Sequence, residues 1–293
     1  MSLVSRVPIE SMQILRTHHI TYATAQYTSS ARLLVRTARK YGLTTRSYGP
    51  SDPAVTALVH RFPQIMAAAR GGGYWLWKPF IIRDAMRNSA DGDAILYSDC
   101  AMVFVADPAP LLALSRNYPI VLFEMSSGQL EKDWTKRDCF LILNADEPIF
   151  WNVPQLWGGV QLYRVGPEAR AFIDVLCEAM SDAHVLTDLP NIHGLPDLPG
   201  FRAHRHDQSV LTILARKFAV PFFPDPSQWG LRVPRLQPLV LADGIERPAA
   251  PYGQVLHVHR KKNDAMLFWY ARHLLKRLVG RRTLHLPAIG GGS

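Results

Sequence analysis

The sequence has few cysteines, no long apolar run and no internal repeat. Its 293 residues include three cysteines that lie far apart, which argues against a disulfide framework or a zinc knuckle. No apolar run approaches the roughly 18 residues that a membrane-spanning helix needs. The first residues, Met1 to Gln13, lack the apolar core and the small-residue cleavage site of a secretory signal. These absences predict a soluble, cytoplasmic protein.

Basic residues are concentrated near the end of the chain. The formal net charge is +9, but eight basic residues lie between Arg260 and Arg282, where only Asp264 opposes them. Basicity confined to one segment argues against nucleic acid as a partner. Apolar residues at helical spacing from Ala265 to Val279 predict a basic amphipathic helix. Such a helix lies on an anionic membrane surface or packs against the protein, and both interpretations stay open.

Three segments follow from these patterns. Hydrophobic residues make up 48% of the chain and charged residues 19%, which is typical of a folded globular domain. We expect one main domain over residues 1–262 and the basic amphipathic helix over residues 263–289. The last four residues, 290–293, are glycines followed by a serine and have the composition of an added linker.

Strand and helix patterns alternate along the main domain. Apolar runs predict strands at Ile14–Thr24, Thr44–Tyr48, Ala94–Ser98, Ile120–Glu124, Leu156–Arg164 and Gln254–His259. Helical periodicity is found at Ser30–Tyr41, Lys78–Ser89, Glu168–Ser181 and Asp207–Phe218. This alternation predicts an α/β fold with a mostly parallel central sheet covered by helices.

Ligands of such sheets bind at the carboxyl ends of the strands. Four segments are therefore expected to meet at one site: Thr21–Thr24, Ser98–Asp99, Gly158–Gly159 and His257–His259.

Two of the segments offer charged groups of opposite sign. Asp99 follows the apolar strand Ala94–Ser98, where a carboxylate either binds a ribose or a metal-bound diphosphate or merely caps a turn. Lys78 follows Trp77 at the start of a helix, after the glycine run of residues 71–73. A helix start with a lysine favours a phosphate, and the glycines allow a hinge or a close backbone approach. The alternative is a loop held to the core by its aromatic residues.

Three further segments are ambiguous in the same way. Gly158 and Gly159 leave room for a ligand or form a bulge. Asp207 either caps the helix that follows it or meets a sugar together with Gln208. His257 and His259 lie two residues apart on a strand, so they can point to one side as metal ligands, or they mark a solvated strand end.

The order of these motifs resembles that of GT-A-type glycosyltransferases. The motifs are the Tyr-Ala-Thr strand end, WKP, DGDAILYSDCA, LWGGVQLYR, HDQSVL and a terminal HxHR, and together they span roughly residues 14 to 262. They are similar to bacterial lipopolysaccharide and capsule transferases, and more distantly to the retaining galactosyltransferase and glycogenin group.

The resemblance implies a GT-A (Rossmann-like) domain and assigns roles to individual residues. Asp99 takes the first position of the family's Asp-x-Asp motif, whereas Ala101 replaces the second Asp and puts dependence on Mn²⁺ or Mg²⁺ in doubt. A metal would be held by Asp99, His257 and His259, and Asp207 and Gln208 would be catalytic. Binding of the nucleotide sugar is expected from Thr21, Tyr22, Ala23, Trp77, Lys78, Tyr97, Asp99, Gly158, Gly159 and Arg260.

These implications lead to an expected function. The chain would transfer a hexose, favoured as UDP-hexose, to a bacterial surface-glycan or lipid-linked acceptor, with retention of anomeric configuration. It would work in the cytoplasm or at the inner face of the cytoplasmic membrane. The alternative is a nucleotidyltransferase or a sugar-nucleotide-binding protein of similar fold. A membrane-bound interaction module built on the basic helix is a third interpretation, but it leaves the carboxylates and histidines without a role.

Overall fold

A six-stranded mixed sheet forms the centre of the molecule. The computed structural model describes residues 16–126, 128–230, 232–240 and 245–263. The strands follow the order β2-β1-β3-β6-β5-β7 across the sheet. They are β1 (Thr17–Tyr22), β2 (Thr44–Tyr48), β3 (Ala94–Ser98), β5 (Ile120–Glu124), β6 (Leu156–Arg164) and β7 (Phe222–Pro224).

The sheet is mostly parallel, with one reversed strand. β1 runs parallel to β2 and β3, and β5 runs parallel to β7, whereas β6 is antiparallel to both of its neighbours. The expected mostly parallel sheet is therefore confirmed, but the reversal of β6 was not expected. Its consequence is that the start of β6 lies at the same edge as the end of β3, since Ser98 pairs with Val160.

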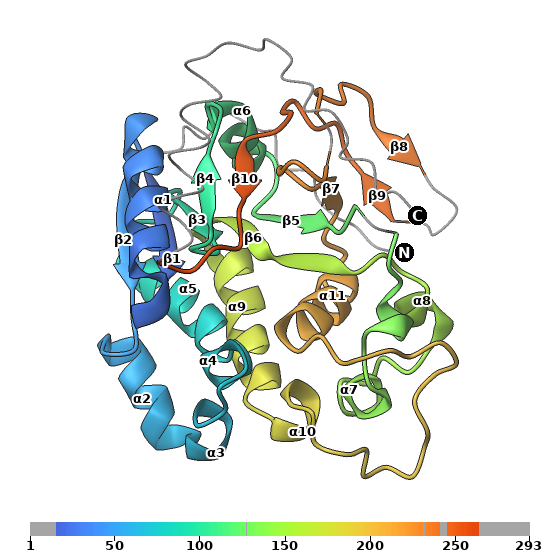
Figure 1. Cartoon of the computed structure of the whole chain (residues 1–293). Helices are drawn as coiled ribbons and strands as arrows, with labels where there is room; N and C mark the ends of the chain where they lie inside the picture. The colour runs from blue at the N-terminus through green and yellow to red at the C-terminus, as the bar shows by residue number, and fades with distance from the viewer. Residues whose placement is uncertain (1–15, 127, 231, 241–244, 264–293) are drawn as a thin grey trace, which may run out of the picture.

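Helices cover the sheet on both faces (Figure 1). On one face lie α5 (Trp77–Arg87), α9 (Pro167–Met180) and α11 (Asp207–Lys217), and on the other lie α1 (Thr28–Lys40) and α6 (Ala109–Leu112). β3 is buried on both sides, because Ile95 and Tyr97 belong to one hydrophobic cluster and Ala94 and Leu96 to the other. Burial on both faces explains why this strand is apolar along its whole length up to Ser98.

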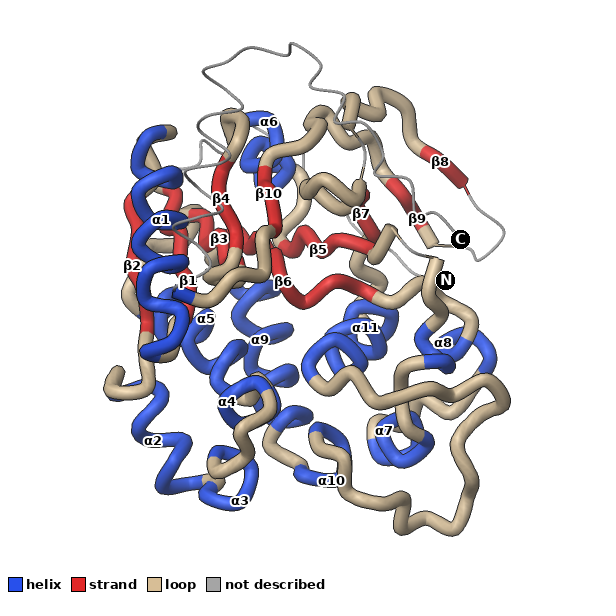
Figure 2. Tube along the Cα trace, viewed as in Figure 1, coloured by secondary structure: helices blue, strands red, loops and turns tan. Residues whose placement is uncertain are grey.

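Short elements complete the chain. Two small antiparallel sheets pair β4 (Met102–Phe104) with β10 (Leu256–Val258), and β8 (Leu239–Val240) with β9 (Glu246–Arg247). The remaining α-helices are α2 (Pro53–Arg61), α3 (Pro63–Met66), α4 (Gly71–Tyr74), α7 (Arg137–Ile142), α8 (Pro148–Trp151) and α10 (Ala183–Leu186). Three-ten turns occur at η1 (Ala25–Tyr27), η2 (Ala113–Arg116) and η3 (Glu131–Asp133). A long loop that is rich in Pro, Gly and Asp joins α10 to α11 (Figure 2).

The expected elements agree closely with the observed ones. The strands β2, β3, β5 and β6 have the bounds that the sequence predicts, and the main helices differ from expectation by one or two residues at their ends. The strands β4, β7, β8 and β9 were not expected; each has only two or three residues, too few for a periodic pattern. β1 ends at Tyr22, two residues before the expected end, and the expected strand Gln254–His259 is reduced to Leu256–Val258 and pairs with β4 outside the central sheet. The three cysteines are free, as expected.

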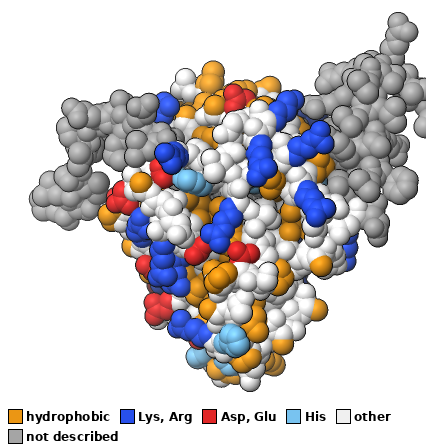
Figure 3. All heavy atoms as spheres, turned by 90° about the vertical axis from the view of Figure 1, so that its left-hand side faces the viewer, with side chains coloured by type: hydrophobic (Ala, Val, Ile, Leu, Met, Phe, Trp, Pro, Cys, Tyr) orange, Lys and Arg blue, Asp and Glu red, His pale blue; other side chains and the backbone are white. Residues whose placement is uncertain are grey.

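Part of the prediction falls outside the described residues. Residues 264–293, which contain the expected basic helix and the linker, are not among them. Among the helices that the structure describes, none has both the length and the apolar character needed to cross a bilayer. On the face formed by the left-hand side of Figure 1, Lys and Arg side chains are interspersed with acidic and hydrophobic ones (Figure 3).

Candidate active site

Two adjoining cavities open at the edge of the sheet where β1 and β3 end. The larger, here called the aromatic cavity, has a volume of about 500 Å³ and is lined by Tyr22, Thr24, Gln26, Tyr27, Ala69, Gly71, Gly72, Trp75, Trp77, Tyr97, Asp99, Cys100, Ala101, Arg260 and Lys262. The smaller, the polar cavity, has about 270 Å³ and is lined by Arg70, Trp75, Lys78, Asp99, Met125, Trp157, Arg205, His206, Asp207, Gln208 and Arg260. The two cavities share Trp75, Asp99 and Arg260, so one extended ligand can occupy both.

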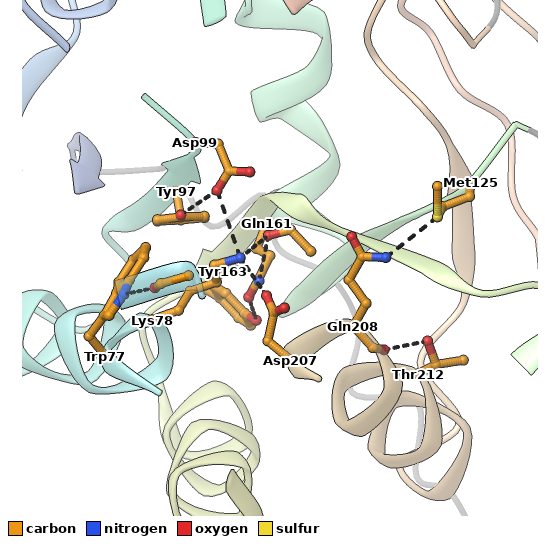
Figure 4. A network of polar contacts seen from close by, with 12 residues as sticks. Trp77, Lys78, Tyr97, Asp99, Met125, Gln161, Tyr163, Asp207, Gln208 and Thr212 are labelled. Carbon is orange, nitrogen blue, oxygen red and sulfur yellow. Dashed lines mark hydrogen bonds and ion pairs between the residues drawn. The ribbon is translucent and has the colours of Figure 1, made fainter. Parts of the chain in front are cut away.

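Asp99 lies at the boundary between the cavities. Its backbone N–H donates to the Gly159 carbonyl oxygen at 2.8 Å, and its Oδ1 accepts from the Tyr97 hydroxyl at 2.5 Å (Figure 4). Tyr97 is fully buried, whereas 39% of the Asp99 side chain stays exposed. The core therefore fixes one carboxylate oxygen while the side chain remains open to a ligand.

Lys78 forms the buried centre of the site. Its Nζ donates to the Gly158 carbonyl oxygen at 3.1 Å and to Asp207 Oδ2 at 2.5 Å, and it lies 3.7 Å from Asp99 Oδ1. Burial by itself would lower the pKa of Lys78, but the carboxylates of Asp207 and Asp99 outweigh burial and raise it. The ammonium group is therefore charged and joins helices α5 and α11 to strands β3 and β6 (Figure 4).

Asp207 does not cap its helix. The N-cap of α11 is His206, and no side-chain capping bond is made there, so the helix-cap interpretation of Asp207 is wrong. The Asp207 carboxylate turns instead toward Lys78 and lines the polar cavity. Gln208 lines the same cavity and donates from Nε2 to the Met125 sulfur at 3.5 Å. Asp207 and Gln208 are thus neighbours at one ligand-sized space.

The glycine run forms a left-handed turn. All five residues from Gly71 to Trp75 have positive φ angles, including the non-glycine residues Tyr74 (52°) and Trp75 (60°). Glycine adopts this conformation freely, whereas L-residues pay for it in strain. The turn lets Trp77 Nε1 donate to the Gly71 carbonyl oxygen at 2.9 Å. The Trp77 ring then stacks on Tyr22 with a centroid distance of 3.9 Å, which forms an aromatic wall.

Gly158 and Gly159 make room for the protein's own side chains. A Cβ at Gly158 would lie 2.8 Å from Asp207 Oδ2, and one at Gly159 would lie 2.6 Å from the Trp157 indole. Neither glycine is among the residues that line the two cavities. Their contribution is made through backbone carbonyls, which accept from Lys78 and from the Asp99 amide.

The expected metal ligands are not gathered into one cluster. Within the described residues, no group of three or more His, Cys, Asp or Glu side chains has the arrangement of a metal site. The His259 backbone N–H donates to the Ala101 carbonyl oxygen at 3.0 Å, and its Nδ1 accepts from the Lys261 amide at 3.0 Å. Burial lowers the pKa of His259 to about 4. With Ala101 lacking a side-chain oxygen, the donor set at Asp99 does not fit a divalent cation held by protein ligands alone.

The other expected site residues divide into two groups. Tyr22, Trp77, Tyr97 and Arg260 line the aromatic cavity. Thr21 is fully buried and Ala23 half-buried, and neither lines a cavity.

Several cavity residues were not expected from the sequence. Gln26 and Tyr27 enter the aromatic cavity because a three-ten turn follows β1 directly. Arg205 directly precedes the HDQSVL motif, and its sequence position did not mark it as part of the site. Met125 enters from the end of β5 and has no signal in the sequence at all.

The Lys78–Asp207 pair is predicted to couple strongly in stability. Lys78→Met leaves buried carboxylates without their cation and should lower the free energy of unfolding by about 3–5 kcal/mol. Adding Asp207→Asn should recover part of that loss, which gives a coupling above about 2 kcal/mol in a urea-unfolding double-mutant cycle. The exposed pair Arg170–Asp91, at 2.9 Å, is the control and should couple by less than about 1 kcal/mol. Equal coupling in the two pairs would contradict the central role of Lys78.

Comparison with known proteins gives structural similarity only. No protein-family model and no curated protein sequence matches the chain. Among solved structures, mouse xyloside xylosyltransferase 1 is 13% identical, with 69% of this chain and 82% of that chain covered and a TM-score of 0.39. Galactosyltransferase LgtC, solved with donor and acceptor sugar analogues, is 12% identical, with 92% and 97% covered and a TM-score of 0.40. The bifunctional glycosyltransferase WbbM is 11% identical, with 68% and 37% covered and a TM-score of 0.40. Each of the three is a glycosyltransferase by name.

Proposed function

We propose that the protein is a glycosyltransferase that moves a sugar from a nucleotide-sugar donor to an acceptor hydroxyl. The observation that carries the proposal is the pair of joined cavities, with Lys78, Asp99 and Asp207 at their boundary. A nucleotide sugar has a flat base, a ribose, an anionic diphosphate and a polyhydroxylated ring. The site offers a matching group for each part, in that order.

The aromatic cavity suits the base and the ribose. Tyr22 and Trp77 present stacked rings, and stacking on aromatic side chains contributes about 1–3 kcal/mol per base. The volume of the aromatic cavity, about 500 Å³, lies in the range of ordinary cofactor sites. The exposed part of Asp99 can accept from a ribose hydroxyl while Tyr97 holds its other contact.

Cations near the boundary suit the diphosphate. Arg260 lines both cavities and Lys262 lines the aromatic one. Lys78 lies beneath them, at the start of α5, where the helix dipole also favours an anion. When the bond between the anomeric carbon and the phosphate oxygen breaks, negative charge grows on the leaving nucleotide. Fixed cations that face this charge lower the barrier.

The polar cavity suits the sugar. Asp207 is held by Lys78 through Oδ2, and its Oδ1 makes no hydrogen bond to any described residue, so it can accept from a sugar hydroxyl. Gln208 adds an amide beside it. In this proposal the two residues orient the ring for attack by the acceptor hydroxyl. The acceptor oxygen bonds to the anomeric carbon as the bond to the phosphate oxygen breaks, and the hydroxyl proton passes to the leaving phosphate.

Further details of the proposal come from the sequence motifs. In this proposal the donor is a UDP-hexose, the anomeric configuration is retained, and the acceptor is a bacterial surface glycan or a lipid-linked glycan. The reaction takes place in the cytoplasm. Contact with the inner face of the cytoplasmic membrane depends on the segment 263–289, whose residues beyond 263 lie outside the described part of the chain.

The proposal predicts release of nucleotide from one class of donor. Incubation with a panel of nucleotide sugars should give nucleoside diphosphate from at least one donor, stimulated by acceptor glycans. Asp99→Ala should weaken binding of that nucleotide about 10- to 100-fold, because a charge-assisted hydrogen bond is lost. Asp91→Ala, at an exposed carboxylate, is the control and should behave as wild type.

Two results would contradict this assignment. Release of pyrophosphate from a nucleoside triphosphate and sugar phosphate would indicate a nucleotidyltransferase. Wild-type nucleotide affinity in a folded Asp99→Ala protein would remove Asp99 from the site.

The cation arrangement predicts weak dependence on divalent metal. Because Ala101 lacks a ligand atom and Lys78, Arg260 and Lys262 carry positive charge at the site, turnover after exhaustive chelation should fall less than about tenfold. The measurement compares initial rates with EDTA and with added Mn²⁺ or Mg²⁺. Complete loss of activity, restored by either ion, would instead require a metal bound with the help of the diphosphate.

A further inference from the structure

The polar cavity carries a positive charge that its own residues do not neutralise. Four basic residues line it, against two acidic ones. Lys78 is paired with Asp207, and Arg70 lies 3.2 Å from Asp188, just outside the cavity. Among the ion pairs of the described residues, none involves the other two, Arg205 and Arg260. Arg260 lines both cavities and so lies at their boundary, where the diphosphate is proposed to bind, whereas Arg205 lines the polar cavity alone.

Arg205 is held in one orientation. Its guanidinium lies 3.7 Å from the centroid of the Trp134 ring, and its Nη1 donates to Gln155 Oε1 at 3.2 Å and contacts the Met125 sulfur at 3.1 Å. Its backbone N–H donates to the Trp134 carbonyl oxygen at 2.9 Å. Gln155 is fully buried, so the group that orients Arg205 is itself fixed. A guanidinium held in this way loses little side-chain entropy when it binds a ligand.

The buried carboxyl group of Glu131 does not neutralise the positive charge of Arg205. Glu131 is fully buried, accepts a hydrogen bond from the Thr135 hydroxyl at 2.5 Å through Oε1, and interacts electrostatically with Arg205. Burial raises the pKa of Glu131 to about 8, so the group is mostly protonated and neutral at pH 7. The positive charge on Arg205 is therefore available to a ligand in the cavity.

We propose that the polar cavity binds a sugar that carries a negative charge, with the carboxylate or phosphate of that sugar held by Arg205. A guanidinium presents parallel N–H donors that match the two oxygens of such a group. The cavity volume of about 270 Å³ accommodates one sugar ring with its anionic substituent. The proposal rests on the proposed glycosyl transfer and specifies its donor: because the donor sugar is placed in this cavity, the negative charge belongs to the donor sugar.

Titration with simple sugars tests the anion site directly. D-glucuronate and glucose 6-phosphate are compared with D-glucose by NMR, with and without saturating UDP, so that no turnover is needed. Wild type should bind both anions at least about tenfold more tightly than glucose, because a charge-assisted hydrogen bond is gained. Raising the salt concentration should reduce that preference.

Arg202 provides a matched control for Arg205, because both guanidinium groups lie over the ring of Trp134. Arg202 also lies over Trp134, at 5.7 Å, but it is exposed and lines neither cavity. Arg205→Gln should abolish the preference for anions, and Arg202→Gln should keep it. Arg205→Lys retains the charge without the planar fork and should give an intermediate preference, which serves as a second variant if Arg205→Gln unfolds.

Nucleotide sugars then test whether the donor carries the charge. Arg205→Gln should weaken binding of UDP-glucuronate but not of UDP-glucose, and saturating UDP-glucose should displace glucuronate from the cavity. Glucuronate that still binds when UDP-glucose saturates the protein would place the anion site outside the donor-sugar space and contradict the inference. Equal binding of glucose and both anions to wild type, or an unchanged preference in folded Arg205→Gln, would overturn the inference. If UDP still binds in that case, the proposed function survives, whereas failure of every nucleotide to bind would count against the proposed function.

Discussion

The site is organised around the ammonium group of Lys78, which is buried away from water. Lys78 is almost fully buried, and a charged amine in that position is tolerated only where acceptors surround it. Asp207, Asp99 and the Gly158 carbonyl meet this requirement, and they come from α11, the exit of β3 and the start of β6. A single charge therefore joins three parts of the chain that are far apart in sequence.

The neighbouring features follow from this constraint. Gly158 has no side chain because Asp207 and Lys78 occupy the space that a Cβ would need. Asp207, the first residue of α11, directs its carboxylate to Lys78. Oδ1 of Asp99 accepts from the buried Tyr97 hydroxyl, while the exposed part of the carboxylate lines the aromatic and polar cavities. The result is a hydrogen-bonded polar floor beneath the two joined cavities, and the proposed transfer relies on such fixed groups to position its substrates.

The fold was largely predictable because local patterns determine it. The strand Ala94–Ser98 is buried on both faces and has no polar residue before its end, so its bounds could be read from the apolar run. The reversal of β6 could not, because strand direction depends on long-range packing that leaves no mark on Leu156–Arg164. At the site, Lys78, Asp99 and Asp207 were identified by type and position. Their mutual pairing, the role of Arg205 and the use of the glycines depend on side-chain packing in three dimensions.

A crystal structure of the protein with an unreactive nucleotide-sugar analogue tests the central claim most directly. The account predicts the base against Tyr22 and Trp77, the diphosphate beside Arg260, and the sugar ring in the polar cavity within hydrogen-bond distance of Asp207. Asp207 should stay paired with Lys78 in the complex. A nucleotide bound elsewhere, or a ligand that leaves both joined cavities empty, would contradict the account.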